Sequence, residues 1–502
     1  MRVVTSDQMR ALDAAAVARV GEVALMHAAG SAIASLVERY ARPGAIVGVA
    51  GPGNNGGDVF AALAVLAPTH ERIIYADPAI VGSTGRADAA RRAHESGVRL
   101  RAFPPDASVL AAAGLILDGI LGANARLPLD ARSSELAAAI NASGAPILAL
   151  DIPTGCDPNS GAVDPAAIRA TATIALGAPK LGCFLDAGRD STGELWCADL
   201  ALRDADADGV GDDYFVMTDR EFRELLPTRS AESDKRSAGA PLLVAGSHQF
   251  PGAGVLSARG AARAGAGYVT LAVPTEAAAA LRAHLIEQVV ITYDEHAPIE
   301  SIGSICDLAS HARALGIGPG LGLGAAMGEI VRGVIARIGL PIVIDASALF
   351  HLSKHLHLVH DKPVVLTPHA GEFARLSGKG TIAAGDRLRR LRAFVAEHDV
   401  TTLLKGRTTL IADRDALHLN PTGTPALATA GTGDVLTGII ATLLAQGLSP
   451  LDAARVGAFW HGRAGMLAAQ ARSVGVVAGD LPELLAQAAQ ARPASPEPAR
   501  IF

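Results

Sequence analysis

The chain has 502 residues, and its 44 Lys and Arg against 50 Asp and Glu give a net charge of −6, which provides no bulk attraction to nucleic acid or to an anionic membrane. Half of the residues are hydrophobic and 19% are charged, a composition that supports buried cores and excludes a disordered protein. The four cysteines lack CxxC spacing, and acids interrupt the N-terminus where a signal peptide needs an apolar block, so we expect a cytoplasmic protein that is neither a disulfide scaffold nor a membrane protein.

Short apolar runs that end at Gly or Asp alternate along the whole chain with helical stretches rich in Ala, Leu and Arg. This alternation predicts parallel α/β sheets. In the first half, the expected strands are residues 45–50, 72–76, 114–117, 146–150 and 171–176. In the second half they are residues 241–245, 268–273, 314–317, 341–344, 363–366 and 401–404, followed by a hairpin-like pair at 408–412 and 416–419.

An acidic stretch at residues 204–213 separates the two halves and shows no apolar periodicity. We predict a junction there between two three-layer α/β/α domains, the first of them Rossmann-like. The predicted boundaries are residues 1–205 for the first domain, 206–218 for a linker and 219–502 for the second domain. The Pro-rich tail at 491–498 is expected to be frayed.

A glycine-rich loop, GPGNNGGD at residues 51–58, follows the first predicted strand and precedes a helical run at 59–67. Its first six residues match GxGxxG, which is a weak indicator when it stands alone. Such a turn at a helix start exposes backbone N–H groups and the positive end of the helix dipole, which suits phosphate. The alternative is a tight turn in which glycine is needed for a positive φ.

Two aspartates, Asp118 and Asp151, each end a predicted strand of the first half. Ligands of open α/β sheets bind at the carboxyl ends of the strands, so these carboxylates and the 51–58 loop are expected to share one site. The alternative for each aspartate is a helix cap or a turn. Lys180 is one of only six lysines and follows the strand at 171–176, where it is either an acid/base or phosphate-binding group or a solvent-exposed side chain.

The combination of GPGNNGGD, DGILG, DIPTGCD and Lys180 resembles the NAD(P)HX epimerase domain over about residues 1–200. Members of that family interconvert the two C6 epimers of hydrated NAD(P)H. The resemblance implies that Asp151 lies beside the reacting ring, and we predict Asp151 and Lys180 as catalytic residues. The nucleotide contacts that it implies are Asn54, Asn55, Gly56, Gly57, Asp58, Gly122, Ala123, Asn124, Ala125, Arg126, Leu127 and Pro128.

The same resemblance implies a potassium ion held by Asn55, Asp118 and Thr154, whose oxygen atoms suit a hard alkali cation. Two departures from the family pattern stand out. Val59 replaces the usual Gly, and Ala123-Asn124 replaces the usual Thr-Gly.

The second half contains no G-K-[ST], which excludes a Walker-type NTPase. Four other loops follow predicted strands or open helices, and they are residues 246–253, 318–322, 367–372 and 430–434. The last loop, AGTGD, is the most informative because the consecutive N–H groups of residues 431–433 can stabilise phosphate charge at a helix N-terminus. Asp434 beside them is placed to accept a proton from an attacking hydroxyl, although it could instead cap the helix.

Lys405 opens the sequence KGRTT between a strand and the hairpin, where it either meets nucleotide phosphate or lies on the surface. His369 either caps the following helix or contacts a ligand. The motifs GSHQFPGA, GIGPGLG, TPHAGE, LLKGRTTLI and ATAGTGDVLTGI together resemble the ribokinase-like superfamily, and within it the ADP- or ATP-dependent NAD(P)HX dehydratases. The resemblance covers about residues 220–490 and implies a ribokinase-like C-terminal domain.

The resemblance implies contacts with the hydrated dinucleotide from Ala253, Gly320, His369 and Asp434. It also implies contacts with the adenine nucleotide, and the residues that we predict to bind it are Lys405, Gly406, Arg407, Thr408, Thr409, Gly431, Thr432 and Gly433. The departures here are Ser347 and Phe350, where the family commonly has Asp and Asn, and Ser237, where a Lys-Gly pair is usual.

Together these motifs predict a bifunctional NAD(P)H-hydrate repair enzyme that uses NAD(P)HX and ADP as substrates, K⁺ in the epimerase domain and Mg²⁺ with ADP in the dehydratase domain. Asp434 would be the catalytic residue of dehydration. We expect a homo-oligomer with no nucleic-acid or membrane partner. Three alternatives remain open, namely a small-molecule kinase in the second half, a non-catalytic binding module in the first half, and a scaffold with two vestigial sites.

Overall fold

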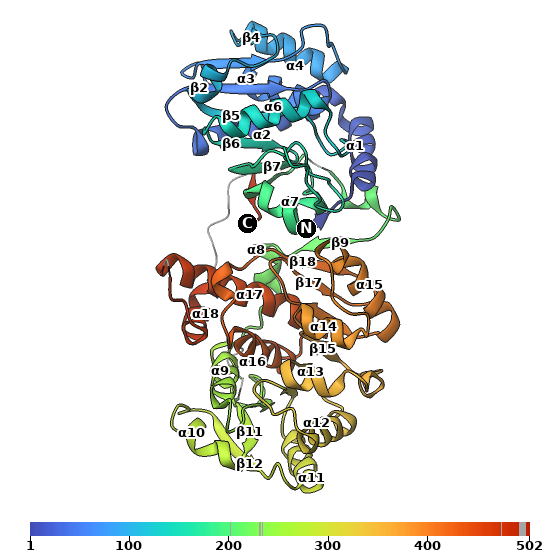
Figure 1. The fold of residues 1–502 in the computed structure, drawn as a ribbon, viewed down its shortest axis with the longest axis vertical. Coiled ribbons are helices and arrows are strands. Elements are labelled where there is room, and N and C mark those ends of the chain that lie inside the picture. The colour runs from blue at the N-terminus through green and yellow to red at the C-terminus, as the bar shows by residue number, and fades with distance from the viewer. Residues whose placement is uncertain (201, 230–231, 233, 473, 491–497) are drawn as a thin grey trace. The chain divides into compact units, whose positions relative to one another are not determined.

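The computed structural model describes residues 1–200, 202–229, 232, 234–472, 474–490 and 498–502 (Figure 1). The chain forms two compact units, one made of Met1–Tyr214 with the C-terminal end of the chain, the other of Phe215–Arg492. Each unit is a sheet covered by helices on both faces, so the predicted fold class of two α/β/α domains is confirmed.

The N-terminal unit is built on an eight-stranded sheet in the order β19-β8-β7-β6-β5-β2-β3-β4. All neighbouring pairs are parallel except β19 with β8. The strands are β2 (Ala45–Ala50), β3 (Arg72–Tyr75), β4 (Arg99–Arg101), β5 (Ala113–Gly119), β6 (Ile147–Leu150), β7 (Ala172–Leu176), β8 (Glu194–Ala198) and β19 (Ala499–Arg500). The helices are α1 (Ser6–Val20), α2 (Glu22–Tyr40), α3 (Asn54–Val65), α4 (Thr84–Glu95), α5 (Ala107–Ala111), α6 (Ala131–Ala142) and α7 (Asp186–Thr192).

Strand β2 lies in the interior of this sheet, and the order changes direction there, since β3 and β4 extend to one side and β5, β6 and β7 to the other. The loops after β2, β5 and β6 therefore open at one edge of the sheet, as they do at the switch point of doubly wound folds. Helices α2, α3 and α4 cover one face with an apolar core, and α5 and α6 cover the other.

The C-terminal unit has the sheet order β18-β17-β16-β15-β14-β13-β10-β11-β12, parallel except for the hairpin that adds β17 and β18. Its strands are β10 (Pro241–Val244), β11 (Thr270–Pro274), β12 (Val289–Tyr293), β13 (Ala314–Ile317), β14 (Ile342–Ile344), β15 (Val364–Leu366), β16 (Thr401–Leu404), β17 (Thr409–Ala412) and β18 (Leu417–Asn420). Its helices are α8 (Asp219–Leu225), α9 (Pro251–Arg263), α10 (Ala278–Arg282), α11 (Pro298–Ala309), α12 (Ala325–Arg337), α13 (Ala346–Leu352), α14 (Ala370–Leu376), α15 (Arg387–His398), α16 (Thr432–Ala445), α17 (Pro450–Ala471) and α18 (Leu481–Ala489).

Helix α16 is the most apolar helix of this unit and packs closely against α9. Two glycines allow the close approach, because a Cβ on Gly438 would lie 2.0 Å from the carbonyl oxygen of Ser257 and a Cβ on Gly260 would lie 2.6 Å from that of Val435. Every residue of α16 after Asp434 is buried, which explains why this part of the sequence carries no charge. This packing also holds the N-terminus of the helix beside the sheet.

Every strand that the sequence predicts is present, with ends that differ by at most two residues. Strands β4, β12 and β19 at sheet edges, and β8 next to β19, were not predicted. The C-terminal strand β19 corrects the predicted domain boundary, since it pairs with β8 of the N-terminal unit and not within the domain predicted at 219–502. A two-residue strand has no periodicity of its own, so only its tertiary partner reveals it. Residues 491–497 of the predicted frayed tail lie outside the described residues.

Over the part of the chain that the structure describes, no single helix combines the length and apolar character that a membrane span requires. Helices α1 and α2 satisfy that criterion only when they are taken together, and they meet at a bend of 111°. All four cysteines are free thiols.

Candidate active sites

In the N-terminal unit, the loops that follow β2 and β5 surround a cavity of about 420 Å³. Of the residues predicted to bind nucleotide, the cavity is lined by Asn54, Asn55, Asp58, Gly122, Ala123, Asn124 and Ala125. Asp151 also lines it. The described residues that line the cavity do not include Gly56, Gly57, Arg126, Leu127 and Pro128.

None of the glycines of the 51–58 loop has a positive φ, which overturns the alternative of a left-handed turn, and close packing requires glycine at positions 51 and 56. A Cβ on Gly51 would lie 1.8 Å from the carbonyl oxygen of Ile120, and a Cβ on Gly56 would lie 2.1 Å from that of Gly51. Gly53 precedes α3 as its N-cap residue, and no side chain caps the helix. The first N–H groups of α3 therefore face the loop without a side-chain acceptor.

Asp151 and Lys180 form a buried ion pair beside the cavity. Lys180 is fully buried, and its ammonium also donates to the carbonyl oxygens of Ala178 at 3.0 Å and Leu176 at 3.3 Å, so the surface alternative for this lysine is wrong. Asp151 has a φ of 68°, a left-handed conformation that is uncommon outside glycine and asparagine. Such a backbone persists where the surrounding structure fixes it, which is frequent at functional sites.

The predicted potassium ligands Asp118, Thr154 and Asn55 are connected by hydrogen bonds, through the carbonyl oxygen of Leu121 in the case of Asn55, and of the three only Asn55 lines the cavity. Asp118 is fully buried and accepts from the Thr154 hydroxyl at 2.7 Å and from the Thr154 N–H at 2.9 Å. Burial raises the pKa of Asp118 to about 6. Asn55 donates to the carbonyl oxygen of Leu121 at 2.9 Å, and its own Oδ1 is buried without a hydrogen-bond partner among the described residues.

Two further carboxyl groups, Asp58 and Asp13, line the same cavity. Burial, with the charges of Asp151 and Asp13, raises the pKa of Asp58 well above its usual range. Partial burial raises the pKa of Asp13 to about 6. The sequence reasoning missed Asp13, because nothing in helix α1 distinguishes it from a solvated aspartate.

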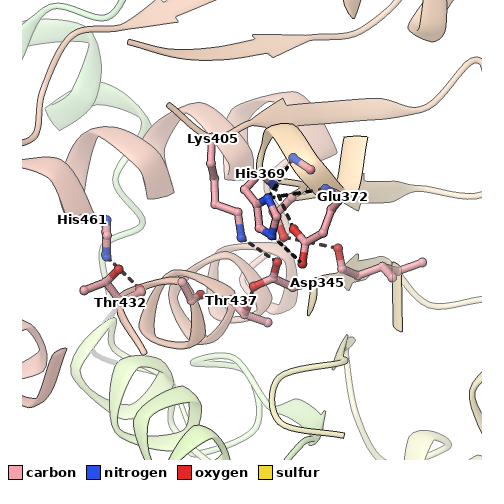
Figure 2. A network of polar contacts seen from close by, with 11 residues as sticks. Asp345, His369, Glu372, Lys405, Thr432, Thr437 and His461 are labelled. Carbon is pink, nitrogen blue, oxygen red and sulfur yellow. Dashed lines mark hydrogen bonds and ion pairs between the residues drawn. The ribbon is translucent and has the colours of Figure 1, made fainter. Parts of the chain in front are cut away.

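In the C-terminal unit, a network of polar contacts connects the ends of β14 and β16 with the start of α16 (Figure 2). Asp345 follows β14 and is almost fully buried. Its Oδ1 accepts from the Lys405 ammonium at 2.8 Å, and its Oδ2 accepts from the Thr437 hydroxyl at 2.8 Å. The predicted nucleotide-binding lysine is therefore held by an ion pair inside the site, and the surface alternative for Lys405 is wrong.

Asp434 lies in the first turn of α16 and does not cap that helix. The N-cap residue is Gly431, with a φ of 93°, and no side chain accepts a hydrogen bond from the helix start. The interpretation of Asp434 as a helix cap is therefore wrong. Burial and the nearby charge of Asp345 raise the pKa of Asp434 to about 7, while Lys405 lowers it. Of the three amides predicted to bind phosphate, that of Thr432 already approaches the carbonyl oxygen of Thr429 at 3.4 Å.

Lys405 and His369 have different surroundings. Burial lowers the pKa of Lys405, but the charges of Asp345 and Glu372 outweigh it and raise the pKa above its ordinary value. His369 caps α14, since its Nδ1 accepts from the N–H groups of Gly371 at 3.0 Å and Glu372 at 3.4 Å. The predicted capping role of His369 is thus observed. Most of its side chain stays exposed, which leaves its ligand contact a prediction.

The loops predicted to hold the dinucleotide meet between β10 and β13. Gly320 has a φ of 66°, and a Cβ there would lie 2.6 Å from the Cβ of Ala253, so these two predicted residues are neighbours. Ser347, a departure from the family pattern, donates to the carbonyl oxygen of Leu321 at 2.5 Å and fastens the 318–322 loop to α13. Phe350 is 39% exposed and lies against the Arg375 guanidinium.

Residues 405–408 form the turn between β16 and β17, and Thr409 is the first residue of β17. The Arg387 side chain from α15 donates to the carbonyl oxygens of Lys405 at 3.3 Å and Thr408 at 3.2 Å, and the Thr409 hydroxyl donates to that of Gly406 at 3.3 Å. The turn is therefore braced by side chains from outside it.

Three residues of this site were missing from the sequence prediction: Asp345, Thr437 and His461. Asp345 carries the same signal as Asp118 and Asp151, an aspartate at a strand end, and could have been found by it. Thr437 and His461 lie inside helices with no local signal. His461 is buried on α17, and its Nε2 lies 2.9 Å from the carbonyl oxygen of Thr432.

The comparisons with known proteins agree with this two-site architecture. A family model described as NAD(P)H-hydrate dehydratase matches residues 241–487, and one described as YjeF-related protein N-terminus matches residues 22–182. The bifunctional NAD(P)H-hydrate repair enzyme of Mycobacterium tuberculosis is 35% identical over 460 residues, which cover 89% of this chain and 90% of that protein. The chain belongs to the family of bifunctional NAD(P)H-hydrate repair enzymes.

Two other relatives extend the comparison. The repair enzyme of Salinibacter ruber is 36% identical over 352 residues, which cover 68% of this chain and 65% of that protein. A solved structure of an ADP/ATP-dependent NAD(P)H-hydrate dehydratase from Bacillus subtilis, co-crystallised with ATP and Mg²⁺, is 31% identical, covers 54% of this chain and 96% of its own, and has a TM-score of 0.48. The two family models and the Mycobacterium tuberculosis enzyme confirm the predicted bifunctional repair enzyme at the level of the family.

The neutral state of His461 gives a testable pH dependence. Burial lowers the pKa of His461 from 6.5 to about 4, so the unfolded chain takes up a proton below pH 6.5 that the folded unit excludes until about pH 4. The free energy of unfolding should therefore decrease as pH falls through this window, and His461→Gln should remove about 2 kcal/mol of the decrease between about pH 7.5 and about pH 5.

Urea unfolding measures this difference through the fluorescence of Trp460 in a Trp196→Phe background, because the two tryptophans lie one in each unit. Glutamine keeps a donor for Thr432 but does not titrate. An equal loss of stability in the histidine and glutamine proteins would refute the assignment.

Proposed function

We propose that the N-terminal domain interconverts R- and S-NAD(P)HX and that the C-terminal domain dehydrates S-NAD(P)HX with consumption of ADP. The observation that carries the proposal is the surroundings of Asp434, a carboxyl group whose pKa is raised to about 7 at the start of α16 and close to the Lys405–Asp345 pair. A base of this pKa beside a phosphate-binding lysine suits proton removal coupled to phosphoryl transfer.

In the proposed dehydration, Asp434 accepts the proton of the C6 hydroxyl, and the hydroxyl oxygen attacks the β-phosphorus of ADP. The bond between the β-phosphorus and the bridging oxygen breaks, and AMP leaves. The lone pair of the ring nitrogen then expels phosphate from C6, and loss of a proton from the neighbouring carbon restores the dihydropyridine. Hydroxide is a poor leaving group and phosphate a good one, which is why the reaction consumes ADP.

The adenine nucleotide would lie against the 405–409 turn, with its phosphates at Lys405 and the amides of residues 431–433. The dinucleotide would lie against Ala253, Gly320 and His369. The described residues contain no cluster of three or more His, Cys, Asp and Glu that could hold a metal ion. Mg²⁺ would therefore be bound chiefly through the nucleotide phosphates, where it would neutralise their charge.

In the proposed epimerisation, the proton held between Lys180 and Asp151 passes through Asp151 to the hydroxyl that leaves C6, and Asp151 takes one back from the water that returns on the other face. The C6 carbon is attached to the ring nitrogen, whose lone pair stabilises the intermediate cation. Lys180 reaches the cavity only through Asp151, so its part is to hold that carboxylate in place and to share this proton with it. Asp58 and Asp13 give the cavity further groups that can hold protons near neutral pH.

The residues proposed to hold K⁺ fit a cation in this structure. The orphaned Oδ1 of Asn55 needs a partner, and the buried carboxylate of Asp118 needs a positive charge. When bound, the ion would supply that charge and hold the loops after β2 and β5 together. We further propose that the protein forms a homo-oligomer.

Substitution of the proposed base should separate the two activities. We expect Asp434→Asn to reduce dehydration of S-NAD(P)HX by about 10²-fold or more, because the general base is lost, and to leave epimerisation intact. Recovery of dihydronicotinamide absorbance from separated R and S epimers, with ADP or ATP present, measures both reactions. Asp307→Asn, an exposed aspartate of α11, is the control.

A fall of both activities, or of neither, would overturn this division of labour. Phosphorylation of a small alcohol by ATP without hydrated dinucleotide would favour the alternative of a small-molecule kinase, which shares the ribokinase-like fold.

The converse substitution tests the N-terminal domain. Asp151→Asn should lower epimerisation by about 10²-fold or more, because the residue that moves the proton is lost, while dehydration of pure S epimer continues. Exchange between the epimers can be followed chromatographically without ADP. Glu135→Gln on α6 changes an exposed acid of the same unit and should have no effect. Unchanged exchange in Asp151→Asn would make this domain a binding module.

The cation proposal has a readout that does not depend on activity. Replacing tetramethylammonium by K⁺ should raise the unfolding temperature of the N-terminal unit by about 2–4 °C, followed by Trp196 fluorescence in a Trp460→Phe background. Thr154→Val should abolish the increase, since it removes an oxygen ligand, and Thr154→Ser should keep it. An increase that survives in Thr154→Val would place the ion elsewhere.

A further inference from the structure

Hydrogen bonds hold both the backbone and the carboxylate of Asp345 in the C-terminal site, and no step of the proposed reaction uses this residue. Its N–H donates to the carbonyl oxygen of Ile317 at 3.0 Å on the neighbouring strand, and its own carbonyl oxygen accepts from Ala348 at 3.1 Å. The next residue, Ala346, has a φ of 48°, which is a left-handed conformation at a residue with a side chain. A Cβ on Gly318 would lie 1.8 Å from the carbonyl oxygen of Asp345, so the neighbouring strand leaves its backbone no room to move.

The carboxylate of Asp345 joins two segments that are distant in sequence. Its Oδ1 holds the Lys405 ammonium at 2.8 Å, and its Oδ2 accepts from Thr437 of α16 at 2.8 Å (Figure 2). The Asp345 side chain is only 2% exposed, whereas that of Lys405 is 25% exposed, so the lysine is the more accessible member of the pair.

The ion pair lies next to Gly433 in the first turn of α16. A Cβ on Gly433 would lie 3.4 Å from the Lys405 Nζ and 3.6 Å from the Asp345 Oδ2. A side chain at position 433 would therefore contact the ammonium, so Lys405 lies next to the glycine turn whose amides are proposed to meet the phosphate. A side chain at position 433 would occupy space next to the Lys405 ammonium that glycine leaves open.

We propose that Asp345 is a positioning residue of the dehydratase site, which holds the Lys405 ammonium against the Gly433 turn so that nucleotide phosphate meets an oriented charge. The proposal rests on the proposed function of this site. An ammonium on a four-carbon stem is otherwise free to take many rotamers, and fixing it in advance avoids that entropic cost when phosphate binds.

The same carboxylate acts on Asp434 through space. The groups that act on Asp434 are the carboxylate of Asp345, which raises its pKa, and the ammonium of Lys405, which lowers it. Lys405 is acted on in turn by Asp345, Glu372 and Asp434. His461 on α17 is neutral at neutral pH because burial lowers its pKa to about 4. Removing the charge of Asp345 should therefore lower the pKa of Asp434.

The test is Asp345→Asn in the full chain, assayed for dehydration of S-NAD(P)HX with ADP across pH. We expect kcat to fall by about tenfold to hundredfold, because the lysine is no longer held in place. We also expect the acidic limb of the pH profile to move about one pH unit lower, because the negative charge that raises the pKa of Asp434 is gone. Epimerisation in the same samples reports that the chain is intact.

Two further variants separate position from charge. Asp345→Glu keeps the charge, so the acidic limb should stay near that of the unmodified protein while kcat falls. Thr437→Val keeps the carboxylate and the lysine but removes one anchor, so kcat should fall with the limb unmoved, and it provides the test if Asp345→Asn does not fold.

An acidic limb in Asp345→Asn that coincides with that of the unmodified protein would overturn the proposal, as would an unchanged kcat in all three variants. Failure of the proposed function is a separate outcome. It would be seen in the unmodified protein as an absence of ADP-dependent dehydration, together with no ADP binding by calorimetry.

Discussion

Charged groups that are buried at the ends of parallel strands must be compensated, and both sites of this protein follow from that constraint. The fold places aspartates where β5, β6 and β14 end, at edges of the sheets that water reaches poorly. An isolated carboxylate is costly there, so each one carries a specific partner. Thr154 bonds Asp118, while Lys180 and Lys405 pair with Asp151 and Asp345.

The two units meet this constraint in parallel ways. In each, a lysine that follows a later strand returns to an aspartate at the end of an earlier one, from β7 to β6 in the first unit and from β16 to β14 in the second. In each, a left-handed residue with a side chain lies at or directly after the aspartate, at Asp151 and at Ala346. Asp58 and Asp434, which have no lysine partner of this kind, have pKa values raised chiefly by burial.

The glycines of the two sites have different structural reasons, although their sequence patterns look alike. In the loop after β2 they permit close backbone contacts at negative φ, as at Gly51 and Gly56. At the start of α16, Gly431 adopts a positive φ, while Gly433 leaves room for the ion pair beside it. A pattern such as GxGxxG therefore indicates that backbone approaches backbone or ligand, but it does not say which.

The sequence alone determined the alternation of strands and helices, the two α/β units and the strand-end positions of Asp118, Asp151 and Lys180, because hydrophobic period and turn residues are local properties. It also placed Asp434 beside a glycine turn. Tertiary structure decided which side chains meet across the sheets: that Lys180 is buried and Lys405 partly buried in ion pairs, that Asp13, Thr437 and His461 belong to the sites, and that the last strand joins the first unit. These facts depend on contacts between residues far apart in the chain, and burial and pKa follow from those contacts, so no local pattern encodes them.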